Sequence, residues 1–388
     1  MRTRIRGVRV FDGASTTART DVLVDGPVIA ADDGGPVDAE VDGTGRTLLP
    51  GLIDAHTHVF DGGLELALRS GVTTELDMFC LPPNLARQRR LAAERDDVAD
   101  LRSAGVLATA PGGHPSQLMD AFGAEEAAAL GDGAGAFDTV AGAGQARAFV
   151  AARVAEGADY LKVVVDDGAL SGARRPTLDA ATLAALVEAA HDAGLAVVAH
   201  ALSAAEVGAA LDAGVDGLAH VFCDAAPGDP AAEELAARAA DHGVFAVTTL
   251  AYFEAIGGSD PDHAHGDAAG PGDALSNAAH AVRVLHRAGV PLLAGTDANP
   301  FAPAHGAGML RELVLLGAAG LAPEEVLAAA TAEPARRFGL TDRGRIAPGL
   351  RADLLLVDGD PTRDLAAVGR ATDVWRRGVR LPLGPSGR

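Results

Sequence analysis

Short apolar segments recur through the middle of the chain, and each is followed by a longer stretch rich in Ala, Leu, Glu and Arg. Short continuous apolar runs are typical of strands buried on both faces, and the longer stretches favour helices. The segments predicted as strands are residues 52–56, 72–78, 106–110, 160–165, 196–201, 217–222, 245–250 and 292–297. The stretch 84–104 is predicted as one of the intervening helices.

Repeated strand–helix units predict an α/β fold with a parallel sheet. With eight such units, we expect the sheet to close into a TIM-type (β/α)8 barrel over residues 49–343. The span from His56 to Asp297 is close to the ~250 residues that one such barrel typically takes. A doubly wound open sheet is the alternative fold, but it does not usually need eight parallel strands.

The two ends of the chain have a different pattern, in which short alternating segments are broken by Asp-Gly and Gly-Gly turns. This pattern is typical of β-hairpins. It occurs at residues 4–11 and 21–24, and again after residue 344. We therefore predict a small β-sandwich domain built from residues 1–48 and 344–388.

The formal net charge of −21 comes from 53 acidic and 32 basic residues. A strongly acidic chain is repelled by phosphate backbones and anionic lipid, so we expect neither nucleic acid nor a membrane as a partner. Two cysteines, Cys80 and Cys223, are too few for a disulfide framework, and the start lacks the apolar region of a signal peptide. We expect a soluble, cytoplasmic protein that acts on a small molecule.

Lys162 is the only lysine among the 32 basic residues. A bias toward Arg codons explains the arginines but not this exception, which stands in the apolar segment 160–165. A surface lysine with a buried stem is the plainer interpretation. The alternative is a position that needs a primary amine.

Histidine and carboxylate side chains stand at the ends of several predicted strands. His56 and His58 form a His-x-His pair, and alternate residues of an extended segment point to the same side. His200 ends the fifth strand, His220 the sixth and Asp297 the eighth. Each alone is more typical of a core residue or a turn. Together they predict one site, because the carboxyl ends of barrel strands meet at one face.

Neutral histidines and a carboxylate are ordinary ligands of zinc and similar divalent metal ions. Four histidines and one carboxylate can serve two ions, and two adjacent cations need a bridging anion. A protonated lysine cannot ligate, but a lysine carboxylated by CO2 carries a carbamate with two oxygens, one for each ion. Arginine cannot supply that amine. We therefore predict two divalent metal ions, most simply zinc, bridged by a carbamate on Lys162.

These residues resemble the metal-dependent hydrolases of the amidohydrolase superfamily, in particular its imidazolonepropionase-like and prolidase-like branch. The resemblance covers nearly the whole chain. It rests on residues 49–58, Lys162, the strands of His200 and His220, Gly295-Thr296-Asp297, and the tail 344–354. Imidazolonepropionase lacks the lysine of the fourth strand and uses one metal ion. Lys162 therefore places the chain with the binuclear, prolidase-like members.

The resemblance implies a division of roles. It assigns the first metal ion to His56, His58 and Asp297, the second to His200 and His220, and the bridge to carboxylated Lys162. A metal-bridging hydroxide would attack the amide of a dipeptide, an N-acyl amino acid or a cyclic amide. Asp297 would accept the proton and later deliver it to the leaving group. A homo-oligomer is the family expectation.

Two further residues are predicted to contact the substrate. His114 follows the third strand in Gly112-Gly113-His114, where prolidase-like relatives carry a comparable sequence. Tyr252 follows the seventh strand and could polarise the substrate carbonyl. A loop histidine that orients a neighbour and an aromatic ring that only packs are the plainer interpretations.

Two other functions stay open. A mononuclear deaminase or imidazolonepropionase-like hydrolase would leave Lys162 structural, but such relatives usually place a carboxylate soon after the fifth-strand histidine. Here Ala201-Leu202-Ser203 follows His200. A non-catalytic structural barrel subunit would normally lack some ligands, and none of the six is missing. Cyclic amides and lactones remain possible substrates, since the same hydroxide attack serves them.

Overall fold

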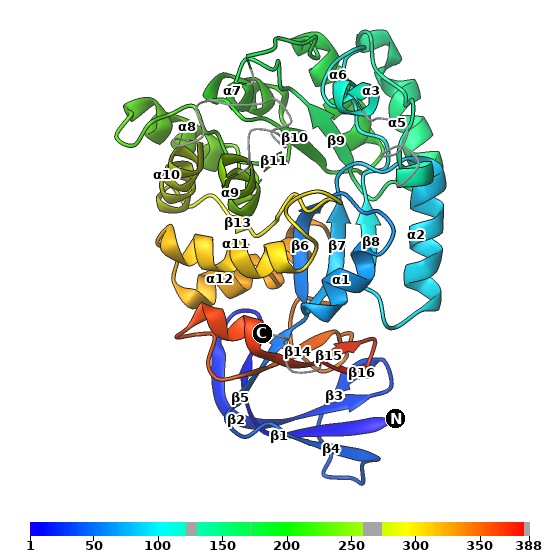
Figure 1. Cartoon of the computed structure of the whole chain (residues 1–388), viewed down its shortest axis with the longest axis vertical. Helices are drawn as coiled ribbons and strands as arrows, with labels where there is room; N and C mark the ends of the chain where they lie inside the picture. The colour runs from blue at the N-terminus through cyan, green and yellow to red at the C-terminus, as the bar shows by residue number, and fades with distance from the viewer. Residues whose placement is uncertain (122–129, 171, 259–273, 384–388) are drawn as a thin grey trace.

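The structure, a computed structural model, describes residues 1–121, 130–170, 172–258 and 274–383. A body of strands surrounded by helices forms the upper part of the molecule in Figure 1. Strands from both ends of the chain form a separate layer beneath it.

The described residues form eight parallel strands in the upper body. They are β6 (Leu52–Thr57), β7 (Val72–Asp77), β8 (Asp100–Ser103), β9 (Leu161–Val164), β10 (Val197–His200), β11 (Gly217–Ala219), β12 (Phe245–Val247) and β13 (Leu292–Leu293). Hydrogen bonds group β6–β8 into one sheet and β9–β13 into another. Parallel bridges of Ala108 with Val163 and of Thr57 with Ala298 join the two sheets on both sides. This closed ring agrees with the predicted barrel.

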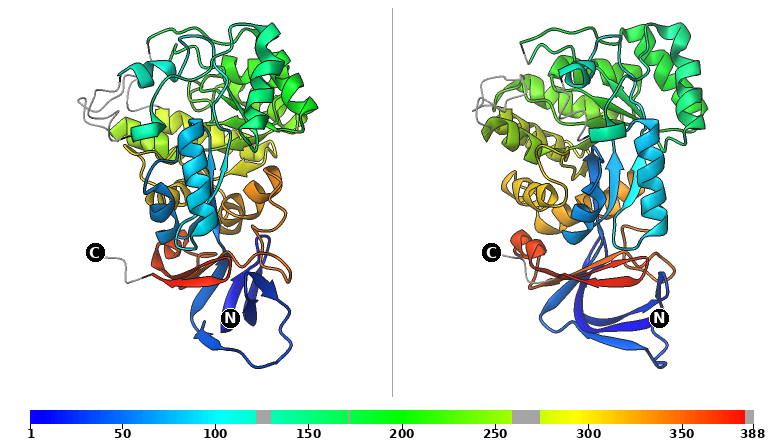
Figure 2. Two further views of the ribbon diagram at one scale, coloured as in Figure 1. Left: turned by 90° about the vertical axis from the view of Figure 1, so that its right-hand side faces the viewer. Right: turned by 45° about the vertical axis from the view of Figure 1, so that its right-hand side comes forward.

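Helices lie outside the strands, as the views in Figure 2 also show. They are α1 (Gly63–Arg69), α2 (Pro82–Glu94), α3 (Ser116–Ala121), α5 (Ala146–Ala155), α6 (Ala180–Asp192), α7 (Ala204–Ala213), α8 (Pro230–Asp241), α9 (Leu250–Gly258), α10 (Ala274–Arg287), α11 (Ala307–Ala318), α12 (Pro323–Ala329) and α13 (Ala332–Arg337), with short 3-10 turns at Gly131–Gly133, Ala143–Gln145 and Leu365–Arg370. Leu183, Leu186 and Ala190 of α6 are buried at helical spacing, so this face packs on the barrel. No helix within the described ranges has the length and apolar character needed to cross a membrane.

The third strand lies earlier in the chain than the sequence pattern predicted. Helix α2 ends at Glu94, and β8 begins at Asp100 inside the stretch 84–104 that was predicted to be helical. The short strand alternates partly buried and buried residues, a pattern that the surrounding Ala, Leu and Arg residues conceal. The predicted segment 106–110 follows it and bonds to β9, with Ala108 N donating to Lys162 O over 2.8 Å.

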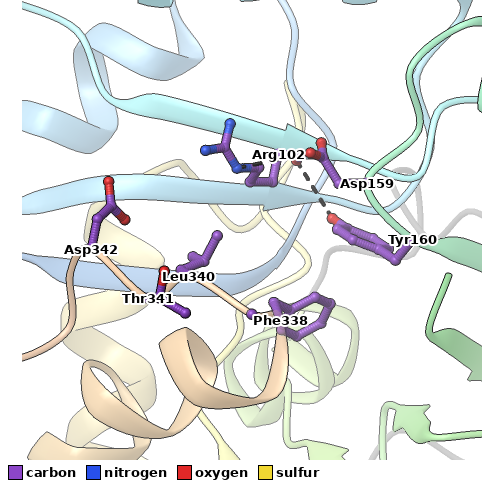
Figure 3. A pocket seen from close by; sticks show the side chains of 8 residues that line it. Arg102, Asp159, Tyr160, Phe338, Leu340, Thr341 and Asp342 are labelled. Carbon is purple, nitrogen blue, oxygen red and sulfur yellow. Dashed lines mark hydrogen bonds and ion pairs between the residues drawn. The ribbon is translucent and has the colours of Figure 1, made fainter. Parts of the chain in front are cut away.

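Small and branched side chains fill the barrel, and aromatic rings close its amino-terminal end. Phe338 packs against Tyr160 and Phe245, with ring centroids 4.9 and 5.4 Å apart. The Tyr160 hydroxyl donates to the backbone oxygen of Asp77 over 2.8 Å. A hollow of about 490 Å³ lies against this aromatic plug, with Arg102 at its rim (Figure 3). The predicted ligands stand at the opposite ends of the strands.

The terminal segments meet in one hydrogen-bonded sheet. Its strands are β1 (Arg2–Phe11), β2 (Thr16–Asp25), β3 (Val28–Ala30), β4 (Ala39–Asp42), β5 (Arg46–Pro50), β14 (Leu354–Asp358), β15 (Ala371–Arg376) and β16 (Val379–Pro382). They form a single sheet in the order β16-β15-β14-β5-β1-β2-β3, with β4 also paired to β1. Among the described residues, β1 pairs with β4 and then β5 along one edge and with β2 along the other, so hydrogen bonds join all eight strands, and the predicted β-sandwich of two sheets is not confirmed.

Three arginines on one carboxylate join this sheet to the barrel. Asp100, at the start of β8, accepts from Arg343 over 2.5 Å and from Arg351 over 2.9 Å, and Arg376 of β15 lies 3.3 Å away. Burial alone would raise the pKa of Asp100, but the three guanidinium groups outweigh it and hold this pKa below the usual value. Asp100 is therefore charged at neutral pH and fixes both layers together.

Candidate metal centre

One oxygen of Asp297 lies between the two histidines of the His-x-His pair. The Nε2 atoms of His56 and His58 are 3.2 and 3.0 Å from Asp297 Oδ1. His56 is the penultimate residue of β6 and is buried, while His58 is partly exposed at the mouth of the barrel. Asp297 follows β13, so strands at opposite ends of the barrel sequence bring the three groups together.

The histidines of the fifth and sixth strands complete a continuous cluster. The rings of His200 and His220 are 4.6 Å apart, and those of His220 and His56 are 4.7 Å apart. His56, His220 and Asp297 each offer a ligand atom within 4.8 Å of the others, which is a spacing that a metal ion could span. The predicted ligands from β6, β10, β11 and β13 therefore share one face.

Lys162 points a buried amine into this cluster. Its side chain is 2% exposed, and among the described residues its Nζ has no hydrogen-bond partner. Burial lowers the pKa of Lys162 to about 7, which Asp297 and Asp77 partly counteract. The amine is close enough to lower the pKa values of His56 and His220. Burying an amine without a hydrogen-bond partner costs free energy, so Lys162 is an expensive residue to keep at this position.

The protonation states suit metal ligands. Burial, with the charge of Lys162, lowers the pKa of His56 to about 3, and burial together with the neighbouring histidines also lowers the pKa of His220. Burial would raise the pKa of Asp297, but His56 and His58 lower it well below its usual value. Neutral imidazoles beside an ionised carboxylate are the forms that bind divalent metals. His200 Nε2 is buried without a hydrogen-bond partner in the described structure, as expected of an atom reserved for a ligand.

The backbone is strained at this site. His220, Thr249 and Asp297 have φ angles of 70°, 47° and 60°, in the left-handed region that residues other than glycine rarely adopt. The Thr249 hydroxyl lies 2.8 Å from His220 Nδ1. Such strain persists only where surrounding contacts enforce it, and it gathers at functional sites.

Asp54, which the sequence reasoning did not select, holds two ligand segments. Its Oδ1 accepts from the backbone N–H groups of His56 and Thr296, over 3.2 and 3.0 Å, and its Oδ2 accepts from the Thr296 hydroxyl over 2.7 Å. Beside it, Glu75 lies 3.0 Å from His305 Nδ1. An acidic residue inside an apolar strand segment was the signal available for Asp54 and Glu75.

The two residues predicted to contact substrate flank the histidine cluster. The ring of His114 stacks on that of His200 at 4.9 Å, and its Nδ1 lies 2.9 Å from Gln117 Nε2. The ring of Tyr252 lies 5.7 Å from that of His220. Asp166 Oδ2 lies 3.6 Å from His200 Nε2, on the side of the cluster that faces the loop after β9. The structure thus brings together all eight residues selected from the sequence.

The comparison with known proteins agrees with this geometry. An imidazolonepropionase from Deinococcus deserti is 39% identical over 102 residues, a match that covers 26% of each chain. A Xaa-Pro dipeptidase crystallised with bound methionine superposes with a TM-score of 0.82 at 21% identity, over 98% of this chain and all of the other. A prolidase complexed with N-methylphosphonate-L-proline gives a TM-score of 0.81 at 22% identity, over 98% and 100%. Residues 47–380 match the amidohydrolase family, and the chain belongs to that family.

Proposed function

We propose that this protein hydrolyses an amide C–N bond of a small molecule at a site for two divalent metal ions. The observation that carries the proposal is the buried, unpartnered amine of Lys162 among the histidines and Asp297. Membership of the amidohydrolase family and the similarity to a Xaa-Pro dipeptidase support the reaction class. Dipeptides, N-acyl amino acids and cyclic amides are the substrates to test first.

The residues present fit two ions. We assign His56, His58 and Asp297 to the first ion, His200 and His220 to the second, and carboxylated Lys162 to both. Zinc is the simplest choice for this donor set. The ions, when bound, lower the pKa of water and polarise the scissile carbonyl.

The side chains supply the remaining chemistry. Asp297 is ionised and lies within hydrogen-bonding distance of two imidazoles. We expect it to accept the proton of the attacking water and to return this proton to the leaving nitrogen. We expect His114, beside His200, and Tyr252, beside His220, to bind the substrate carbonyl or carboxylate. The aromatic plug closes the other end of the barrel, so substrate enters from this face.

A mononuclear imidazolonepropionase-like reaction is the second candidate. The sequence matches favour it, because curated relatives of that name share 39% identity over part of the chain. Lys162 favours the binuclear proposal instead, since a lysine in a merely structural role would be expected to form hydrogen bonds.

The test is turnover by protein purified with zinc and bicarbonate and without chelator. A panel of dipeptides, N-acyl amino acids and cyclic amides is assayed for the release of new amine or carboxylate groups. Imidazolone propionate is assayed for ring opening, and aminated heterocycles are assayed for the release of ammonia. Amide cleavage that disappears in dipicolinate and returns with zinc supports the proposal. Turnover confined to the ring-opening or ammonia-releasing substrates supports the second candidate. No turnover of any substrate by metal-loaded protein contradicts both.

A further inference from the structure

Glu312 is a buried carboxylate that has no role in the proposed hydrolysis. It lies on α11, its side chain is fully buried, and it reaches across to the turn that follows β12. Its Oε1 accepts from the Thr248 hydroxyl over 2.5 Å, and its Oε2 accepts from Ala251 N over 2.6 Å. Burial raises the pKa of Glu312 to about 7, which these hydrogen bonds only partly offset. The fold therefore maintains a costly group at this position.

The carboxylate caps a helix that belongs to a different segment. Helix α9 begins at Leu250, and its first N–H groups lack partners within the helix. Glu312 accepts from the N–H group of Ala251 in the first turn, so it performs from α11 the task of a side chain at the N-cap. Negative charge at this end is also favoured by the helix dipole.

The capped turn contains the strained residue that contacts a predicted ligand. Thr249, with φ of 47°, lies between Thr248 and the start of α9, so bonds to Glu312 flank it on both sides. A β-branched residue in the left-handed region needs such support. The turn carries the Thr249 hydroxyl to 2.8 Å from His220 Nδ1.

The same turn also positions Tyr252. Tyr252 N donates to Thr249 O over 3.1 Å, and the Tyr252 ring lies 5.7 Å from the His220 ring. Glu312 thus supports one side of the cluster in two ways, through the hydroxyl beside a predicted metal ligand and through the first turn of the helix that presents Tyr252.

We infer that Glu312 is a positioning residue, which acts through Thr249 to keep the Nδ1 proton of His220 on the threonine side and its Nε2 free for metal. This inference rests on the proposed function. A neutral histidine binds metal through one nitrogen only when the other carries the proton, and the hydrogen bond of that second nitrogen selects the tautomer. Glu312 touches neither His220 nor substrate, so its effect on the site is indirect.

Thr249→Val tests the contact with His220, and Thr249→Ser is the conservative variant that restores a hydroxyl. We expect Thr249→Val to lower the affinity for the more weakly held zinc ion by about 10–100-fold, the range seen when a hydrogen-bond partner of a metal ligand is lost. Competition with a fluorescent chelator measures this affinity. Thr249→Ser should recover most of this loss. In metal-free protein, ¹⁵N shifts of the His220 ring should report the Nδ1–H tautomer in the wild type and a mixture in Thr249→Val.

Glu312→Leu removes both acceptors at similar volume, and Glu312→Gln retains an acceptor for Ala251 N–H. Glu312→Leu should reproduce the tautomer mixture and the weaker zinc binding, and Glu312→Gln should restore both at least in part. Glu254→Gln is the matched control, because Glu254 is a surface carboxylate on α9 that pairs with Arg311. If Glu312→Leu does not fold, the Thr249 variants still test the contact between Thr249 and His220. The ¹⁵N shifts of the His220 ring in Glu312→Gln then test the role of the carboxylate.

Unchanged tautomer and unchanged zinc affinity in Thr249→Val would overturn the inference. The inference would also be overturned if Glu254→Gln changed the His220 tautomer and the zinc affinity as much as Glu312→Leu does. A wild-type protein that binds no zinc contradicts the proposed function, and the ¹⁵N shifts of metal-free His220 then still test the hydrogen-bonding role of Thr249. The two failures are therefore distinguishable.

Discussion

The Thr296 hydroxyl donates a hydrogen bond to Asp54 Oδ2 over 2.7 Å, and this contact joins residues 242 positions apart in the chain. Asp54 precedes the His-x-His pair and Thr296 precedes Asp297, so one buried contact links the two segments that carry the first three predicted ligands. The Thr296 oxygen also accepts from Ala298 N over 3.0 Å. The spacing of His56, His58 and Asp297 therefore depends on a bond that none of them makes.

Thr296→Val removes this bond at nearly constant volume. It leaves a buried N–H and a carboxylate oxygen without partners, so we expect unfolding free energy to fall by about 1–3 kcal/mol and zinc affinity to fall with it. Urea denaturation and chelator competition measure the two effects. Thr3→Val is the control, since Thr3 is equally buried and its hydroxyl has no partner among the described residues. Equal effects from both substitutions would contradict this role of Thr296.

Asp100→Asn tests the junction between barrel and terminal sheet. Removing the carboxylate leaves the buried arginine charges uncompensated, so we expect the free energy of unfolding to fall by on the order of 3 kcal/mol at pH 7. Asp97→Asn, at an exposed pair with Arg95, should cost less than about 1 kcal/mol. Urea denaturation of both variants measures the difference.

We also expect the effect of Asp100→Asn on the free energy of unfolding to depend on pH. The arginines lower the pKa of folded Asp100, so its stabilising effect is fully present above the unfolded pKa of about 4 and is lost as pH falls through the lower folded value. The stability difference between wild type and Asp100→Asn should therefore be constant from pH 5 to 7 and shrink below pH 4. A difference that grows on acidification would contradict this account.

The strand ends and their ligands could be predicted because their signals are local. His56 and His58 share a motif, and His200, His220 and Asp297 each close a short apolar segment, so the barrel hypothesis alone places them together. Lys162 could be selected because it is the one lysine among the 32 basic residues. The third strand was misplaced because β8 is short and lies within a stretch of helix-forming residues.

The supporting residues could not be predicted in the same way. Thr249 and Glu312 act through contacts between segments far apart in the chain, and an acidic residue on an amphipathic helix is usually solvent-exposed. The single terminal sheet depends on β1 pairing with partners on both edges, which alternation alone does not specify.

His114→Ala tests substrate recognition without disturbing the metal ligands. A hydrogen bond to a charged substrate group contributes about 1.5–3 kcal/mol, so we expect kcat/KM to fall about 10–100-fold with zinc content unchanged. His242→Ala, at an exposed helix end, is the histidine control. Loss of zinc from His114→Ala would instead make this residue a ligand.

The binuclear site is tested by metal content per chain, measured by plasma mass spectrometry on wild type and Lys162→Arg purified with bicarbonate and without chelator. Arginine retains a positive charge but cannot form the carbamate. We expect about two divalent ions in the wild type, a ¹³C carbamate signal from labelled bicarbonate, and one ion or fewer in Lys162→Arg. One ion in both proteins, with no carbamate signal, would contradict the binuclear site.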